Sequence, residues 1–149
     1  MADLPVQDIV ELEQVLAKYA VAATMNDAET LVEVFTPDGR YSAFGEVYTL
    51  DDFPALFEAA PSGLFSVGTP WVDLDLESGT GTGKQTLLFV SQTDHHMRMG
   101  WYTDTYRRTD DGWRLETRSM TFLRRSGAQD SGKAHDPLRP TSSFKAEPA

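Results

Sequence analysis

The sequence predicts an α+β protein in which helices precede a long antiparallel sheet. Apolar residues recur at helical spacing from Val6 to about Met25, whereas the chain after Pro61 alternates short apolar segments with Gly- or Asp-containing turns. Helices that precede a run of strands in this way pack together on one face of the sheet. A chain of 149 residues suits one domain with its own core.

Three helices are expected before the sheet. The first spans Val6 to about Met25 and is amphipathic. Residues 26–29 offer a capping side chain for a short second helix, which a turn at residues 36–39 (Thr-Pro-Asp-Gly) should end. A short hairpin is expected within residues 40–48, and a third helix over residues 49–60.

Four strands are expected over residues 65–77, 84–93, 95–108 and 112–123. The Gly-rich residues 78–83 are predicted to be a flexible hairpin loop, because their spacing is not that of a phosphate-binding loop and no helix follows. Residues 126–149 are polar, contain prolines and show no apolar period. We therefore expect a folded domain over residues 1–125 and a flexible or surface-wrapping tail over residues 126–149, in preference to an ordered lid.

Composition narrows the classes of protein to consider. A formal net charge of -10 repels phosphate backbones and anionic lipids, so we expect no nucleic-acid or membrane partner. The acidic residues are dispersed, which is typical of a solvated surface. The chain has no cysteine, no secretory signal pattern and no apolar run long enough to span a bilayer. We expect a cytoplasmic protein without a thiolate metal site.

Two separated segments carry a family resemblance. Residues 19–39, which end in Phe35-Thr-Pro-Asp-Gly39, and residues 100–115, which include Tyr102-Thr-Asp-Thr-Tyr106, together resemble the SnoaL-like branch of the nuclear transport factor 2-like superfamily. The resemblance implies a cone-shaped curved sheet with the helices on its concave face, enclosing an apolar pocket. It also implies chemistry without a cofactor, a small hydrophobic substrate, and a homodimer or homotrimer assembled through the sheet face.

The branch includes dehydratases, cyclases and a dehydrochlorinase, and several of its enzymes pair an Asp with a His. Aligning this sequence to that pattern puts Thr24 at the Asp position and Ser66 at the His position. Neither hydroxyl can act as a general base near neutral pH unless another group takes its proton. Thr24 and Ser66 are therefore predicted only as substrate contacts.

Other residues are candidates for the chemistry. The resemblance places Tyr19 where some dehydratases carry a pocket tyrosine and Arg118 near a pocket arginine. Tyr19 or Tyr41 could donate a hydrogen bond to the substrate, although a buried structural tyrosine is an equally good interpretation of Tyr19. Either His95 or His96 could serve as base, while no metal-binding pattern surrounds them. Strict alternation points Arg118 away from the pocket, so it reaches the substrate only if its strand bulges.

The expected strand over residues 95–108 has two faces of different character. The more apolar face is predicted to point inward (His95, Met97, Met99, Trp101), and the other is predicted to form a subunit interface (Arg98, Tyr102, Tyr106). A bulge would reverse this assignment. The remaining predicted pocket residues are apolar or aromatic (Phe44, Tyr48, Phe57, Leu64, Phe65, Trp71), although most of them could be ordinary core.

The leading hypothesis is a cofactor-independent lyase or isomerase that acts on a small hydrophobic cyclic or aromatic substrate. The alternative is a non-catalytic protein that binds a small ligand or a partner, because both residues of the Asp/His pair are replaced. A small subunit of a ring-hydroxylating oxygenase is a weaker third possibility, since nothing in the sequence identifies its large partner.

Overall fold

The computed structural model describes residues 3–43 and 45–125. Its elements follow in the order α1 (Val6–Thr24), α2 (Ala28–Glu33), β1 (Phe35–Ala43), β2 (Glu46–Thr49), the 3-10 helix η1 (Leu50–Asp52), α3 (Phe53–Ala59), β3 (Gly63–Val67), β4 (Trp71–Asp75), β5 (Thr80–Ser91), β6 (Met97–Thr109) and β7 (Gly112–Arg125). The predicted order of helices, hairpin and long strands is confirmed, except that the strand predicted over residues 65–77 is divided into β3 and β4. The predicted tail over residues 126–149 lies outside the described residues.

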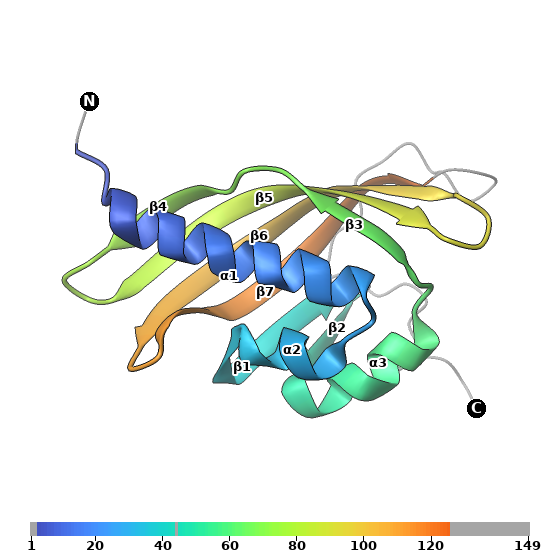
Figure 1. Cartoon of the computed structure of the whole chain (residues 1–149), viewed down its shortest axis with the longest axis horizontal. Helices are drawn as coiled ribbons and strands as arrows, with labels where there is room; N and C mark the ends of the chain where they lie inside the picture. Colours follow the sequence, from blue (N-terminus) through green and yellow to red (C-terminus); the bar gives the residue numbers. More distant parts are fainter. Residues whose placement is uncertain (1–2, 44, 126–149) are drawn as a thin grey trace.

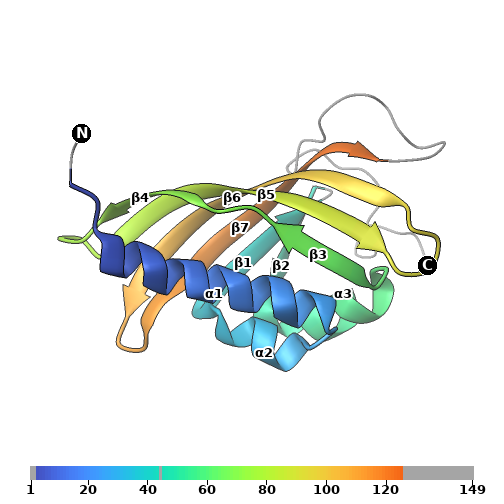
Figure 2. The same ribbon diagram turned by 45° about the horizontal axis from the view of Figure 1, so that its top comes forward.

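The strands form one curved sheet that arches over the helices. Its order is β2-β1-β7-β6-β5-β3, and β4 also pairs with β5. Figures 1 and 2 show α1 lying across the concave face, with α2 and α3 beside its C-terminal end. The α+β fold with helices on the concave face is thus confirmed. The sheet is mixed rather than wholly antiparallel, because β1 runs parallel to β7.

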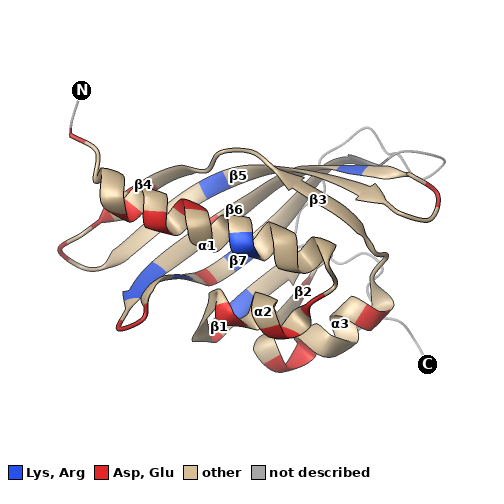
Figure 3. Cartoon of the chain, in the orientation of Figure 1, with Lys and Arg blue, Asp and Glu red and all other residues tan. Residues whose placement is uncertain are grey.

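The amphipathic first helix forms as predicted because its apolar stripe faces the sheet. Leu12 and Leu16 are fully buried, and Tyr19 lies one turn further along. Two carboxylates fix its N-terminal half: the Trp113 indole Nε1 donates to Asp8 at 2.9 Å, and the Trp113 backbone N–H donates to Glu11 at 3.2 Å. Many of the other described acidic residues lie on the helices and hairpin turns (Figure 3), as expected of a solvated surface, whereas Asp104 is buried in the sheet.

Two predicted loops prove to be strand. Residues 36–39 belong to β1, whose pairing with β7 shifts register between Phe35 and Arg40, so the Pro-Asp-Gly segment forms an irregularity within the strand. Residues 80–83 belong to β5. A side chain at Gly81 would approach Leu74 to 2.5 Å, and one at Gly83 would approach the Tyr106 hydroxyl equally closely. These glycines therefore allow close packing and do not form a loop.

The predicted facing of β6 is wrong. Tyr102, Asp104 and Tyr106 are buried on the concave face, while Trp101 points to the opposite face of the sheet and is partly exposed. Aromatic and charged residues can occupy the inner face here because they contact one another, as described below. The predicted interface role of Arg98, Tyr102 and Tyr106 falls with this correction.

A bulge in β7 sets the orientation of Arg118. The pairing of β6 with β7 shifts between Thr105 and Tyr106, which lie opposite Thr117 and Leu115, so one extra residue of β7 lies between the two pairs. Arg118 consequently shares the buried face with Trp113 and Leu115. Of the two orientations that the sequence allowed, the structure has the inward one.

Within the described residues, no helix is long and apolar enough to cross a membrane.

Candidate functional site

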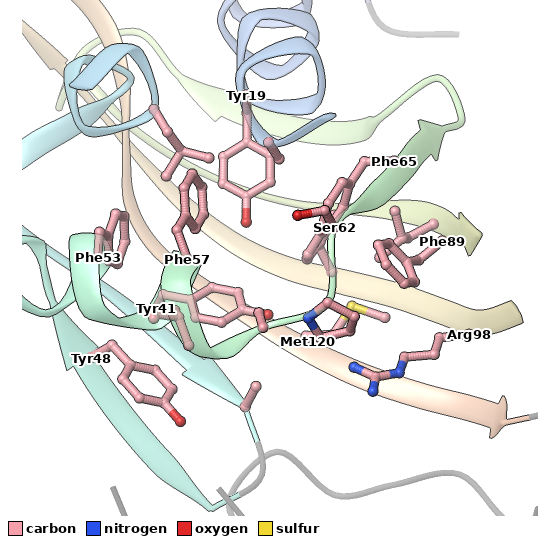
Figure 4. A pocket seen from close by; sticks show the side chains of 18 of the residues that line it. Tyr19, Tyr41, Tyr48, Phe53, Phe57, Ser62, Phe65, Phe89, Arg98 and Met120 are labelled. Carbon is pink, nitrogen blue, oxygen red and sulfur yellow. The ribbon is translucent and has the colours of Figure 1, made fainter. Parts of the chain in front are cut away.

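The sheet and helices line a predominantly apolar, partly open pocket of about 120 Å³. Its walls come from the C-terminal end of α1, from α2 and α3, from β3 and from the concave face of the sheet (Figure 4). The described lining residues are Tyr19, Ala23, Asn26, Leu31, Tyr41, Ala43, Tyr48, Phe53, Leu56, Phe57, Ala60, Pro61, Ser62, Phe65, Leu87, Phe89, Arg98, Tyr102, Met120 and Phe122. The site is therefore a small aromatic pocket with few polar groups.

Tyrosines from different elements supply most of those polar groups. Tyr19 comes from α1, Tyr41 from β1, Tyr48 from β2 and Tyr102 from β6. Figure 4 shows the hydroxyls of Tyr19, Tyr41 and Ser62 directed toward the middle of the pocket, whereas that of Tyr48 points away from Tyr19. Tyr19, Tyr41 and Tyr48, which the sequence placed at the pocket, are among its lining residues.

Three of the pocket tyrosines, Tyr19, Tyr41 and Tyr102, are held in their neutral form. Burial raises the pKa of Tyr19, although the nearby Arg118 charge opposes the shift. Burial likewise raises the pKa of Tyr41 and of Tyr102 well above the ordinary value of about 10. At neutral pH these hydroxyls are therefore hydrogen-bond donors and not bases.

A buried ion pair lies behind two of the tyrosines. Arg118 Nε and Nη2 each donate to Asp104 at 2.8 Å, and Nη2 also donates to Gln85 at 2.9 Å. The Arg118 guanidinium carbon lies 3.7 Å from the centre of the Tyr102 ring and 4.4 Å from that of Tyr19. The Tyr106 hydroxyl donates to Asp104 as well, at 3.1 Å. The cluster thus joins both tyrosine rings to one fixed cation.

Arg118 itself does not line the cavity, so its predicted role as a clamp on the substrate is not supported. Arg118 is fully buried. Within the part of the chain that the structure describes, its Nη1 has no hydrogen-bond partner. Burial alone would lower the pKa of Arg118, but the Asp104 carboxylate raises it, so the guanidinium stays charged. Arg118 contacts the rings of Tyr19 and Tyr102, which line the pocket.

The predicted base is not in the pocket. His95 and His96 are exposed in the turn between β5 and β6, and neither is among the lining residues. His95 has a φ of 60° there, while His96 lies 3.4 Å from the Asp94 carboxylate. The prediction that His95 and His96 begin a strand was wrong, because the turn after β5 extends two residues further than the alternating pattern suggested. No described lining residue is a histidine or a carboxylic acid.

Several predicted substrate contacts also lie elsewhere. Thr24 Oγ1 accepts a hydrogen bond from the Phe65 N–H at 3.0 Å, so it joins α1 to β3. Six other predicted contacts are not among the lining residues and are partly or largely exposed (Leu64, Ser66, Trp71, Met97, Met99, Trp101). Trp71 is 81% exposed. These six residues belong to the opposite face of the sheet, which the reversed facing of the strands explains. Phe44 lies outside the described residues.

Sequence reasoning missed several lining residues, notably Asn26, Phe89, Arg98 and Phe122. One signal was available for Arg98. It lies an even number of residues from Tyr102, Asp104 and Tyr106 on the same strand, so its side chain points to the same inner face as theirs. Asn26 gave no comparable signal, because it reaches the pocket from the turn after α1 with a φ of 58°. Among the described residues no cluster of His, Asp or Glu could hold a metal ion.

The curved mixed sheet and the three helices on its concave face define a nuclear transport factor 2-like fold. The sequence profile of the SnoaL-like domain matches residues 5–119, and the chain belongs to this family. It is 30% identical over 131 residues to the uncharacterized protein Rv2910c of Mycobacterium tuberculosis, covering 78% of this chain and 86% of that one.

Solved structures of low sequence identity share the fold. A variant of Rv3472 from Mycobacterium tuberculosis, a protein of unknown function, has a TM-score of 0.72 at 20% identity and covers 80% of this chain and 78% of its own. A putative scytalone dehydratase from Novosphingobium aromaticivorans has a TM-score of 0.67 at 17% identity, covering 94% and 99%. At such identities the likeness concerns the fold alone.

Proposed function

We propose that this protein is a cofactor-independent lyase or isomerase that acts on a small hydrophobic cyclic or aromatic compound. The observation that carries the proposal is the convergence of the Tyr19 and Tyr41 hydroxyls in an apolar pocket. An apolar enclosure with a few convergent polar groups is the usual form of a small-molecule site. The family membership and the structural similarity to a putative scytalone dehydratase support the same class of reaction.

The tyrosines would activate an oxygen of the substrate by donating hydrogen bonds. A ketone oxygen or a departing hydroxyl gains negative charge in the transition state of an enolisation or a dehydration. Donors fixed by packing stabilise that charge without reorganising, and the ring of Tyr19 is held between Phe35 and Tyr102. Tyr19 and Tyr41 keep their own protons in this scheme, since burial raises the pKa of both groups.

The substrate proton would leave to water. In a dehydration the C–H and C–O bonds break, a C=C bond forms, water accepts the proton, and the departing oxygen leaves as hydroxide stabilised by the tyrosine donors. This route differs from chemistry that uses an Asp/His pair, because no described lining residue has a basic side chain of that kind. It favours substrates whose product is aromatic or conjugated, as these lose a proton readily.

A second candidate function is ligand binding without turnover. The specific observation that favours it is the same lack of a carboxylate or histidine among the described lining residues. Such a protein would still use the aromatic walls and the tyrosine donors to hold its ligand.

One experiment separates the two functions. The purified protein is screened by thermal shift against cyclic ketones, phenols and hydroxylated ring compounds, and each ligand is then followed by NMR for product. We expect Tyr19→Phe to lower the rate of product formation about 100-fold with a small change in melting temperature. Tyr48→Phe is the matched control, because its hydroxyl points away from that of Tyr19. Binding without product would favour the second function, and an unchanged rate in Tyr19→Phe would exclude the assigned role.

A further inference from the structure

The proposed chemistry leaves the buried cation behind the pocket without a role. The Arg118 guanidinium carbon lies 4.4 Å from the centre of the Tyr19 ring and 3.7 Å from that of Tyr102. The two tyrosine rings meet edge to face, with their centres 5.6 Å apart and an angle of 77° between their planes. Both tyrosines line the pocket, whereas Arg118 does not. The cation can therefore influence a bound molecule through these two side chains.

The ion pair with Asp104 does not use the whole of the guanidinium. Nε and Nη2 of Arg118 donate to Asp104, and Nη2 donates to Gln85 as well. Nη1 is buried and has no hydrogen-bond partner among the described residues. A buried donor without an acceptor is costly, and a contact between the cation and an aromatic face offsets part of that cost. The contacts with Tyr19 and Tyr102 are thus part of what holds the cation in place.

The hydrogen bond between the two tyrosines has a definite direction. Burial raises the pKa of Tyr102, and the hydrogen bond with Tyr19 adds to the rise. Burial also raises the pKa of Tyr19, but the Arg118 charge and the hydrogen bond with Tyr102 oppose the shift. A donor loses its hydrogen bond when it ionises, whereas an acceptor gains from ionising. The Tyr102 O–H therefore donates to the Tyr19 oxygen, which leaves the Tyr19 proton for a different acceptor.

The Tyr19 hydroxyl is directed toward the middle of the pocket (Figure 4). Its proton is therefore placed for the oxygen of a bound carbonyl or hydroxyl compound. When a tyrosine donates a strong hydrogen bond, its own oxygen gains negative charge. The Arg118 cation and the Tyr102 donor both stabilise such a charge, so they strengthen the hydrogen bond that Tyr19 gives.

We infer that Arg118 and Tyr102 are positioning residues for Tyr19: they hold its ring, direct its proton into the pocket and strengthen its hydrogen bond to the oxygen of a bound ring compound. The inference rests on the proposed function and adds two residues to that same site. A buried ion pair is often no more stabilising than apolar residues of the same volume. The position of the Arg118–Asp104 pair against two pocket tyrosines therefore has a functional reason in addition to a structural one.

The test uses cyclohexanone labelled with carbon-13 at the carbonyl, bound to the full chain at neutral pH and observed by NMR. A hydrogen bond to the carbonyl oxygen moves this resonance downfield, so the shift reports the strength of the donor and not the stability of the fold. We expect a downfield shift on binding to the wild type, and the loss of most of it in Tyr19→Phe. Tyr102→Phe should lose part of the shift, because it keeps the ring and removes the hydroxyl that donates to Tyr19.

A double variant tests the cation. Arg118→Met combined with Asp104→Leu removes both members of the ion pair, so that neither charge is left buried alone. We expect it, too, to lose part of the carbonyl shift. Tyr106→Phe is the matched control for Tyr102→Phe, because it removes another buried hydroxyl of the same strand, one that donates to Asp104. Tyr106→Phe should leave the shift unchanged. If the double variant does not fold, Tyr102→Phe still decides the inference, since the ion pair stays intact in it.

The outcomes are distinct from those of the proposed function. An unchanged shift in Tyr102→Phe or in the folded double variant would overturn the inference, and so would an equal loss in Tyr106→Phe. Cyclohexanone that does not bind, or a bound shift that Tyr19→Phe leaves unchanged, would also overturn it, because Tyr19 would then offer no donor to a carbonyl. The proposed function is decided separately, by whether the ring compounds of the thermal-shift screen give a product.

Discussion

Arg118 and Asp104 form a two-point ion pair in the interior of the protein, with Nε and Nη2 each 2.8 Å from a carboxylate oxygen. Both side chains are inaccessible to solvent. A pair buried in this way is costly to break, because the remaining charge stays in a medium that solvates it poorly. The pair also holds the cation against the rings of Tyr19 and Tyr102, so it connects the stability of the sheet to the geometry of the pocket.

Removing one member of this pair should strongly destabilise the protein. We expect Asp104→Asn to lower the free energy of unfolding by about 3–5 kcal/mol, because it leaves the Arg118 cation buried without a counter-ion. Urea denaturation followed by circular dichroism measures the change. The control is Arg107→Met, which breaks solvent-accessible ion pairs with Asp38 and Glu116 and should have a much smaller effect. A small change in Asp104→Asn would mean that water reaches the cluster.

The raised pKa values of the buried tyrosines predict that the folded protein loses stability at alkaline pH. Burial raises the pKa of Tyr19, Tyr41, Tyr102 and Tyr106 in the folded state. In the unfolded state these groups ionise near pH 10, so above that pH the unfolded chain binds fewer protons than the folded one. Their contribution is complete below about pH 10, and stability falls as the pH rises further.

The expected result is one cooperative transition above pH 10, in which tyrosinate absorbance at 295 nm appears together with the loss of far-ultraviolet circular dichroism. Tyr106→Phe should shift that transition to higher pH, because it removes one hydroxyl whose pKa falls on unfolding. Tyrosinate absorbance that grows well before unfolding would show that the hydroxyls are solvated.

The part of the fold that local periodicity determines was predictable from the sequence. The first helix was predicted over its whole length because its apolar face repeats at helical spacing, and its boundary at Thr24 differs by one residue from the prediction. The Asp27 side chain that accepts from the Thr30 N–H begins the second helix where capping residues were recognised. Such signals lie within one element, so they can be recognised without knowing which other elements pack against it.

The orientation of the strands was not predictable in the same way. Alternation shows which residues share a face, but not which face is buried, and the more apolar set of β6 lies outside. The inner face carries Arg118 and Asp104 because each satisfies the other, which is a property of two strands and not of either. The bulge that turns Arg118 inward leaves no mark in the sequence that alternation can detect.

The corrected facing changes where subunits should meet. The homodimer or homotrimer expected from the family resemblance would use the outward face of the sheet, which carries Met97, Met99 and Trp101. We expect Trp101→Arg to convert that oligomer to a monomer, because a charge replaces an aromatic side chain at the interface. Light scattering during gel filtration measures the mass.

Val10→Arg is the control for the oligomer, since Val10 is half exposed on α1, and α1 lies on the concave side of the sheet. A wild-type protein that is already monomeric would disprove the expectation. An oligomer that survives Trp101→Arg would place the contact on another surface.

Thr24 ties two walls of the pocket together, and its loss should affect both stability and binding. Its Oγ1 accepts from the Phe65 N–H at 3.0 Å, while the neighbouring Ala23 and Phe65 itself line the cavity. Thr24→Val keeps the shape but leaves that N–H to water, so we expect a loss of about 1 kcal/mol in the free energy of unfolding and several-fold weaker ligand binding. Urea denaturation and calorimetry with a ligand from the screen measure the two effects. Thr24→Ser keeps the hydroxyl acceptor and should match the wild type in both stability and binding. A Thr24→Val protein that matches the wild type would show that packing alone holds β3 against α1.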